Sequence, residues 1–171
     1  GFDVTTSGPS MKTYDYASAN YVGVSGTGIP IYNPKGYFVF VRGDRTVTSA
    51  FSAAIETVLR TKGKLFTPAN IPPVTVVNAN SFESAGNPYA SPIDMRKIGR
   101  TGDVLPNFIV WDSRLGSQNG YGAFQYFFQM NPSDPNSDYV VTPGGGSYGA
   151  SLSVNNYIQS GQAFFVQTRS G

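Results

Sequence analysis

The stretch that most restricts the fold covers residues 81–98, SFESAGNPYASPIDMRKI, because residues that dictate the backbone lie close together in it. Gly86 permits a positive φ, while Pro88 fixes its own φ and keeps Asn87 out of the α region. These three residues therefore predict a sharp turn at the end of a strand.

A short helix is expected directly after this turn. Ser91 suits the N-cap, Pro92 suits the first helical position, and Asp94 brings a negative charge close to the helix N-terminus. The sequence thus predicts one short helix over residues 92–98, and a structural role for the residues of the turn and of the helix start.

The composition favours short strands joined by turns. Charged residues make up 13% of the 171 residues and aromatic residues 14%, and there are 20 Gly and 12 Pro. Aromatic residues favour strands, and Gly and Pro favour turns. We therefore expect a single all-β domain over residues 1–171, a two-sheet β-sandwich of about ten to fourteen short strands. A closed β-barrel is the alternative, and the opening GFDV is typical of a fragment of a longer protein.

Apolar runs and alternating patterns between turn-forming residues indicate where the strands lie. The run YFVFV after Gly36 is continuous, which predicts a strand buried on both faces. Residues 47–55 are assigned to a loop or a short turn. The segments expected to form strands or hairpins are 12–24, 36–42, 57–65, 108–111, 121–130 and 161–168.

The two halves of the chain show a similar order of features, which suggests a degenerate internal duplication. An apolar strand follows Gly36 in the first half and Gly161 in the second, and an aromatic-Asp pair precedes each strand, at residues 14–15 and 111–112. Such a duplication predicts two similar sets of strands that face each other as the two sheets of the sandwich.

The segment GNPYASPID resembles the GNPY-S-ID signature of large cell-surface and secreted proteins of the Bacteroidota. In that family the signature lies in a β-rich module upstream of a C-terminal type IX secretion sorting domain. Family members usually have an aromatic residue where Met95 stands here. The resemblance implies an extracellular or cell-surface location and no established chemistry. Further segments that fit the pattern, in the same order, are GYFVFVRGDR (36–45), TVLRTKGKL (57–65), FIVWD (108–112) and SGQAFFVQT (160–168).

The resemblance also implies a way in which copies assemble. In the family the chain continues past the last matching segment into another strand, whereas this sequence stops at Gly171. We therefore expect an open sheet edge beside residues 161–168, and an open edge accepts a strand from another chain. The partners that this implies are other copies of the chain or neighbouring modules of the same protein.

The composition disfavours several classes of function. With no His and no Cys, the chain lacks the most common general base and the usual ligands of transition metals. A net charge of +2 is too small to indicate nucleic-acid binding, and no apolar run approaches the ~20 residues of a membrane span. No spacing among Asp94, Asp103 and Asp112 fixes an acid-base pair. We therefore predict no enzyme activity, no catalytic residues and no cofactor-binding residues.

Calcium is the one ion that a sequence pattern leaves open. Asp134, Asn136 and Asp138 alternate as in D-x-N-x-D, the start of a calcium-binding loop. Neither the Gly nor the Glu that would complete an EF-hand loop follows. The alternative is a plain turn, because Asp and Asn favour turns.

Aromatic side chains are the second candidate site. The candidate carbohydrate-binding residues are Trp111, Tyr121 and Tyr126, because aromatic rings stack on the apolar faces of sugars. The alternative is that these rings pack inside the sandwich or pair across strands. A solvent-facing row of aromatic residues would favour carbohydrate binding, and burial would favour a structural role.

Two charged motifs are interpreted as structural. Residues 42–44 read RGD, an integrin-binding tripeptide, but Gly-Asp after a strand also makes a good hairpin turn. Arg60, Lys62 and Lys64 share one strand face, which is typical of a solvated face or of a protected edge.

The function expected from all of this is a non-catalytic structural or assembly module of a bacterial cell-surface or secreted protein. It would polymerise through strand exchange at the open edge. The alternative is a carbohydrate-binding module of a surface adhesin, with polysaccharide as its partner.

Overall fold

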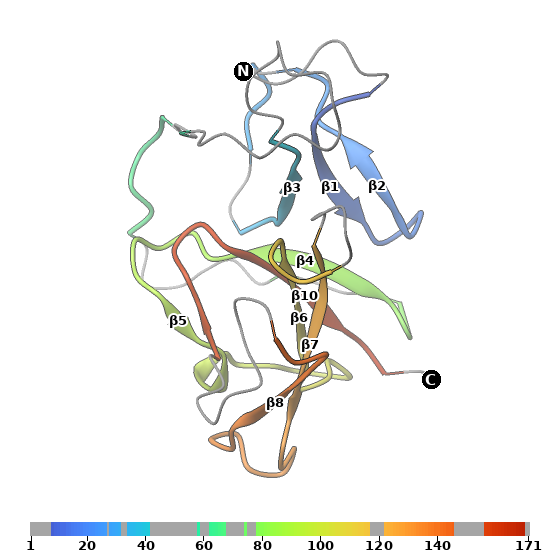
Figure 1. The fold of residues 1–171 in the computed structure, drawn as a ribbon, viewed down its shortest axis with the longest axis vertical. Coiled ribbons are helices and arrows are strands. Elements are labelled where there is room, and N and C mark those ends of the chain that lie inside the picture. Colours follow the sequence, from blue (N-terminus) through green and yellow to red (C-terminus); the bar gives the residue numbers. More distant parts are fainter. Residues whose placement is uncertain are drawn as a thin grey trace.

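The computed structural model describes residues 8–26, 28–31, 34–41, 58, 62–67, 74, 78–116, 122–145 and 156–169. Within these residues the chain is all-β, and its antiparallel strands form three sheets, none of which closes into a barrel (Figure 1). The arrangement agrees with the expected β-sandwich. The elements are β1 (Met11–Asp15), β2 (Asn20–Gly23), β3 (Tyr37–Val39), β4 (Phe82–Gly86), β5 (Ile93–Asp94), the 3₁₀ helix η1 (Met95–Lys97), β6 (Phe108–Asp112), β7 (Ala123–Gln129), β8 (Tyr139–Thr142), β9 (Tyr157–Ile158) and β10 (Ala163–Gln167).

The largest sheet has five strands in the order β4-β10-β6-β7-β8. Because successive side chains of a strand point to opposite faces, Phe108 and Val110 of β6 lie on one face of this sheet, and Ile109 and Trp111 lie on the other. The two faces are covered by different parts of the chain. No helix among the described residues is long and apolar enough to cross a membrane.

One face of the five-stranded sheet carries the hydrophobic core. It packs against the small sheet of β5 and β9 and against η1, which contribute Ile158 and Met95. The rings of Phe108 and Phe127 stack with centroids 4.4 Å apart, and Tyr139 meets Phe108 edge-on at 5.0 Å. The buried residues of this core are Ala85, Met95, Phe108, Val110, Phe127, Tyr139, Ile158 and Phe164.

The opposite face is covered in part by the three-stranded sheet, whose order is β2-β1-β3. Tyr14 of β1 meets Phe165 of β10 edge-on, with ring centroids 5.5 Å apart. Phe38 of β3 contacts Trp111 at 5.6 Å and Phe124 at 6.0 Å. A second apolar layer, rich in aromatic rings, therefore lies between these two sheets.

The strands of the two halves occupy equivalent positions. The hairpin β1–β2 was expected within residues 12–24, and β3 pairs antiparallel with its first strand. In the same way, β10 pairs antiparallel with the first strand of the hairpin β6–β7. The orders β2-β1-β3 and β7-β6-β10 thus correspond, and the two sets face each other through aromatic contacts, as an internal duplication predicts.

β4 is hydrogen-bonded to both halves. Along one edge it pairs with β10. Along the other edge the amide of Gly36 donates to the carbonyl of Ser84, and the amide of Gly86 donates to the carbonyl of Pro34. A Cβ on Gly86 would lie 3.1 Å from the carbonyl oxygen of Lys35, so this glycine is explained by close packing of two chain segments rather than by a positive φ.

The predicted turn follows β4, and the buried side chain of Asn87 organises it. Its amide nitrogen donates to the carbonyl of Ser91 at 2.8 Å and to the carbonyl of Ile158 at 3.0 Å. Its Oδ1 accepts from the amide of Tyr89 at 3.0 Å. The turn before and after Pro88 is therefore tied directly to β9.

The helix begins later than the sequence predicts, and Ser91 is not its N-cap. After Pro92 the chain stays extended because β5 pairs with β9. Asp94, with φ −87° and ψ 116°, caps η1 instead, and its side chain accepts a hydrogen bond from the amide of Arg96. The pairing of distant strands has overridden the local helix signal, and the helix is a single 3₁₀ turn.

Two predicted strands also differ from the structure. β3 is shorter than the expected segment 36–42 and lies at the edge of its sheet, so it is not buried on both faces, and Phe40 beyond its end is 58% exposed. The described part of segment 57–65 contains no strand. The rest of that segment lies outside the described residues, as does segment 47–55.

The expected open edge beside residues 161–168 is wrong. β10 lies inside the five-stranded sheet, with β4 paired on one side and β6 on the other. Phe165, for example, lies opposite Ser84 on β4 and opposite Ile109 on β6. Among the described residues, the outermost strands of this sheet are β4 and β8.

Candidate binding surface

A group of aromatic side chains lies on β6 and β7, on the face of the five-stranded sheet opposite the core. The alternation of side chains places Trp111, Phe124, Tyr126 and Phe128 there. Trp111 is 38% exposed, Tyr126 41% and Phe128 43%. We call these four residues the aromatic face.

The rings of the aromatic face are held in place by one another. Those of Tyr126 and Phe128 are nearly parallel, with an interplanar angle of 12° and centroids 6.1 Å apart. Trp111 meets Phe124 edge-on at 4.9 Å and Phe38 at 5.6 Å. Because packing fixes these orientations, a ligand that contacts the rings loses little side-chain entropy.

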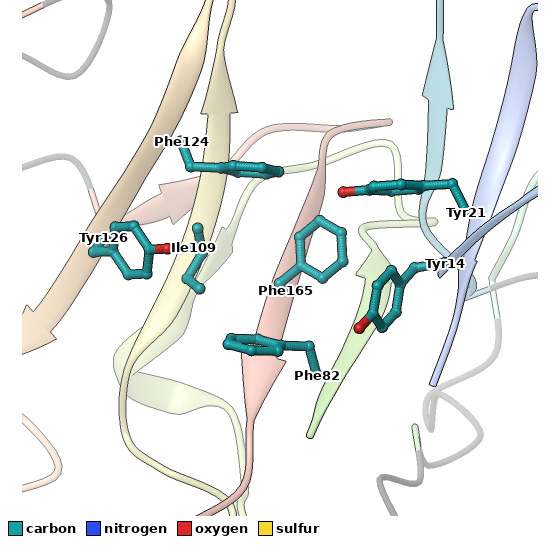
Figure 2. A pocket seen from close by; sticks show the side chains of 7 residues that line it. All are labelled: Tyr14, Tyr21, Phe82, Ile109, Phe124, Tyr126 and Phe165. Carbon is teal, nitrogen blue, oxygen red and sulfur yellow. The ribbon is translucent and has the colours of Figure 1, made fainter. Parts of the chain in front are cut away.

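A pocket of about 150 Å³ opens beside the aromatic face, between the five-stranded and three-stranded sheets (Figure 2). In Figure 2 the hydroxyl groups of Tyr21 and Tyr126 point inward from opposite sides of this pocket. Phe165 lies between Phe124 and Phe82 at its centre. The lining residues are Tyr14, Tyr21, Phe82, Ile109, Phe124, Tyr126 and Phe165.

The described lining of the pocket contains no charged side chain. Burial raises the pKa of the Tyr21 phenol, and the neighbouring Tyr14 adds to the shift. Tyr21 therefore keeps its proton at neutral pH and presents a neutral hydroxyl, which can donate one hydrogen bond. Such a pocket favours uncharged ligands, because a charged group would lose its hydration without a compensating partner.

The structure places two of the three candidate carbohydrate-binding residues on one face. Trp111 and Tyr126 belong to the aromatic face, whereas Tyr121 lies outside the described residues. Sequence reasoning missed Phe128, although its spacing of two residues from Tyr126 within an expected strand places it on the same face.

The calcium candidate loop carries its own polar contacts. The carboxylate of Asp134 accepts from the amide of Asn136 at 2.9 Å, as in an Asx turn. The side-chain oxygen of Asn136 accepts from the ammonium of Lys97 at 2.7 Å, and Asp138 pairs with the guanidinium of Arg96 at 3.2 Å. Two cations therefore occupy positions close to the oxygens that would bind calcium, which favours the plain turn. Calcium binding itself stays a prediction.

Two of the three carboxylates considered for acid-base chemistry, Asp94 and Asp112, have structural partners. Burial raises the pKa of Asp94, but hydrogen bonds from Arg96 outweigh it and hold that pKa below its ordinary value. Arg96 approaches this carboxylate to 2.9 Å, and Asn156 donates to it as well. Buried Asp112 accepts from the amide of Arg114 at 2.8 Å. These two carboxylates are thus used in capping and in a turn.

The two charged motifs are described only in part. The RGD tripeptide at residues 42–44 lies outside the described residues, as does Arg60. Lys62 and Lys64 are exposed, as expected for a solvated basic segment.

Comparison of the chain with protein-family models, with curated proteins and with solved structures finds no match. The arguments about function therefore depend on the geometry of this chain.

Proposed function

We propose that this chain is a non-catalytic binding module of a bacterial cell-surface or secreted protein, and that its aromatic face binds a polysaccharide. The observation that carries the proposal is the exposure of Trp111, Tyr126 and Phe128 together on one side of the sheet. Exposed rings on one side of a sheet support a binding role. Neutral sugars present both C–H faces and hydroxyls, and the face offers rings together with the Tyr126 hydroxyl.

The contribution of each ring of the aromatic face to the affinity for a sugar follows from the area that the sugar covers. A sugar that covers roughly 40 Å² of one ring gains about 1 kcal/mol at ~25 cal/mol per Å², which corresponds to roughly fivefold in affinity. Trp111→Ala and Phe128→Ala are therefore each expected to weaken binding about fivefold. Both residues lie outside the pocket lining, although Trp111 packs against Phe124 and Phe128 against Tyr126, which do line it.

The test is affinity electrophoresis against a panel of neutral and acidic polysaccharides, followed by calorimetry on any that retards the chain. Phe40→Ala is the matched control, since Phe40 is an exposed ring outside the aromatic face. Retardation that is reduced by Trp111→Ala and Phe128→Ala, but not by Phe40→Ala, supports the proposal. Retardation by none of the polysaccharides, or equal losses in all three variants, contradicts it.

A second candidate function is assembly through β8 (Tyr139–Thr142). Within the described residues this strand pairs only with β7, so its outer edge has no neighbouring strand. Exposed Phe128, Met130 and Val140 lie beside that edge. An unpaired edge flanked by apolar side chains can accept a strand from another copy.

Sedimentation velocity over a range of concentrations tests this candidate. Assembly at the β8 edge predicts species larger than the 18.3 kDa monomer, and Val140→Lys should shift them to monomer because edge lysines oppose pairing. Negative-stain microscopy of the same samples shows whether the larger species are filaments. A monomer at every concentration removes this candidate and leaves the binding role.

A further inference from the structure

We propose that the pocket between the two sheets is a binding site for a single uncharged aromatic ring with one hydroxyl group, the phenol class of ligand. This inference goes beyond the proposed polysaccharide surface, although Tyr126 contributes to both. Trp111 and Phe128 belong to the aromatic face alone, and Tyr21 belongs to the pocket alone. The two sites can therefore be tested separately.

The size of the pocket fits one six-membered ring. Its volume is about 150 Å³. An apolar space of about 150 Å³ is large enough for one benzene ring. A disaccharide or a fused three-ring compound is too large for this space, so the expected ligand is a small single ring.

The walls of the pocket suit a ring rather than a flexible chain. Phe165 meets Tyr14 edge-on at 83° and Phe124 edge-on at 85°, with centroids 5.5 Å and 5.8 Å apart. Aromatic rings prefer such edge-to-face contacts, and each is worth more than its buried area alone. A ligand ring placed against Phe165, which Phe82 and Phe124 flank in Figure 2, can extend the same pattern.

The polar groups of the pocket indicate a single hydroxyl on the ligand. The hydroxyls of Tyr21 and Tyr126 point inward, from the three-stranded and the five-stranded sheet respectively (Figure 2). A ligand hydroxyl beside either of them can donate to it or accept from it. A sugar ring carries several hydroxyls, most of which would be left without partners against phenyl walls, and a buried polar group without a partner is costly.

The test is a titration of the full chain with phenol, followed in amide NMR spectra. The amides of Ile109, Phe124 and Phe165 are expected to shift saturably, with glucose, benzoate and cyclohexanol as comparison ligands at equal concentration. Phenol should bind more tightly than cyclohexanol, because the flat ring fits the edge-to-face walls. Benzoate should bind more weakly than phenol, because its charge would be buried without a partner.

Variants then show which tyrosine hydroxyl forms a hydrogen bond with the ligand. Tyr21→Phe and Tyr126→Phe keep the rings and remove one hydroxyl each, so the variant that lacks the hydroxyl bonded to the ligand should weaken phenol about threefold to tenfold while leaving benzene unchanged. Phe40→Ala is the matched control and should leave phenol binding unchanged, because Phe40 is an exposed ring outside both the pocket lining and the aromatic face. Spectra of all variants without ligand show whether each one is folded.

Three results would overturn the inference. These are the absence of saturable shifts at the pocket amides up to millimolar phenol, stronger shifts with glucose than with phenol, and equal phenol affinity in both Tyr→Phe variants and the parent chain. None of these outcomes depends on polysaccharide binding at Trp111 and Phe128, so failure of one site is distinguishable from failure of the other.

Discussion

Replacing Asn87 by alanine removes the side chain that ties the turn after β4 to β9. Asn87 is 2% exposed, and its amide group makes hydrogen bonds to the carbonyls of Ser91 and Ile158 and to the amide of Tyr89. Ile158 is buried, so its carbonyl finds no water in place of the lost bond and keeps only the partner that the β5–β9 pairing provides. The exposed Ser91 can be hydrated instead.

The magnitude follows from these three bonds. Losing one of two hydrogen bonds at the buried Ile158 carbonyl costs about 1 kcal/mol, and the partly buried Tyr89 amide adds about 1 kcal/mol. We therefore expect Asn87→Ala to lower the free energy of unfolding by about 2 kcal/mol. For a chain of this size that corresponds to a fall in Tm of roughly 4–8 °C.

Urea denaturation followed by intrinsic fluorescence measures this loss, with the slope m compared between variants. Asn136→Ala is the matched control, because Asn136 is exposed and its side chain bonds only to a surface lysine. That variant should stay within about 0.5 kcal/mol of the parent chain. A loss below about 1 kcal/mol for Asn87→Ala, at an unchanged m, would refute the reasoning.

A charged replacement at the same position adds a pH dependence. In Asn87→Asp one oxygen can still accept from Tyr89, but the other faces the carbonyls of Ser91 and Ile158, so its pKa should be higher in the folded chain than in the unfolded chain. The penalty is then absent below the unfolded pKa of about 3.9 and grows as the pH rises through the folded pKa. Unfolding curves at several pH values between 3 and 8 check the sign.

Three further variants test the core, the cap and one strained glycine. Phe127→Ala, at a ring with no exposed surface, should cost about 3–5 kcal/mol in urea unfolding, whereas Phe128→Ala on the outer face of the same strand should stay within about 1 kcal/mol. Asp94→Asn should cost about 1 kcal/mol at pH 7. Since the pKa of Asp94 is lowered by folding, the parent chain should lose this advantage as the pH falls through that pKa, and the two chains should converge in acid. Gly122→Ala should cost at least about 2 kcal/mol by thermal unfolding, because φ is +83° there and the new Cβ would lie 2.5 Å from a backbone carbonyl oxygen.

Local chemistry made part of this fold predictable from sequence. The hairpin of β1 and β2 was found because turn-forming residues separate two short aromatic runs, and its turn is closed by Asp15, which accepts hydrogen bonds from Ser18. The strands β6, β7 and β10 were found because their apolar runs are long and bounded by turns. For β1–β2 and β6–β7 the paired strands are also neighbours in sequence.

Long-range pairing decided what sequence could not predict. The signal at Ser91 and Pro92 indicates a helix, but β9, more than sixty residues later, holds this part of the chain extended. Position within a sheet is equally non-local. The continuous apolar run after Gly36 reads as a buried strand, and it lies at an edge because no described strand pairs with its outer side.

The aromatic face and the pocket also depend partly on local sequence and partly on long-range contacts. The alternation within β7 suffices to put Tyr126 and Phe128 on one face, because that requires only the strand period. Their exposure depends on where the three-stranded sheet stops covering the five-stranded one. The pocket depends on Tyr14, Tyr21 and Phe165, which come together only when both sheets are in place.

The double pairing of β4 has a consequence for how the chain opens. Since β4 is bonded to β10 on one side and to the segment before β3 on the other, neither half can separate without breaking the backbone pairing of the same strand. The two similar strand sets should therefore behave as one cooperative unit. In amide hydrogen exchange, the amides of Gly36 and Gly86, which bond along one edge of β4, and of Asn87, which donates to Gln162 just before β10, should report a common free energy of opening.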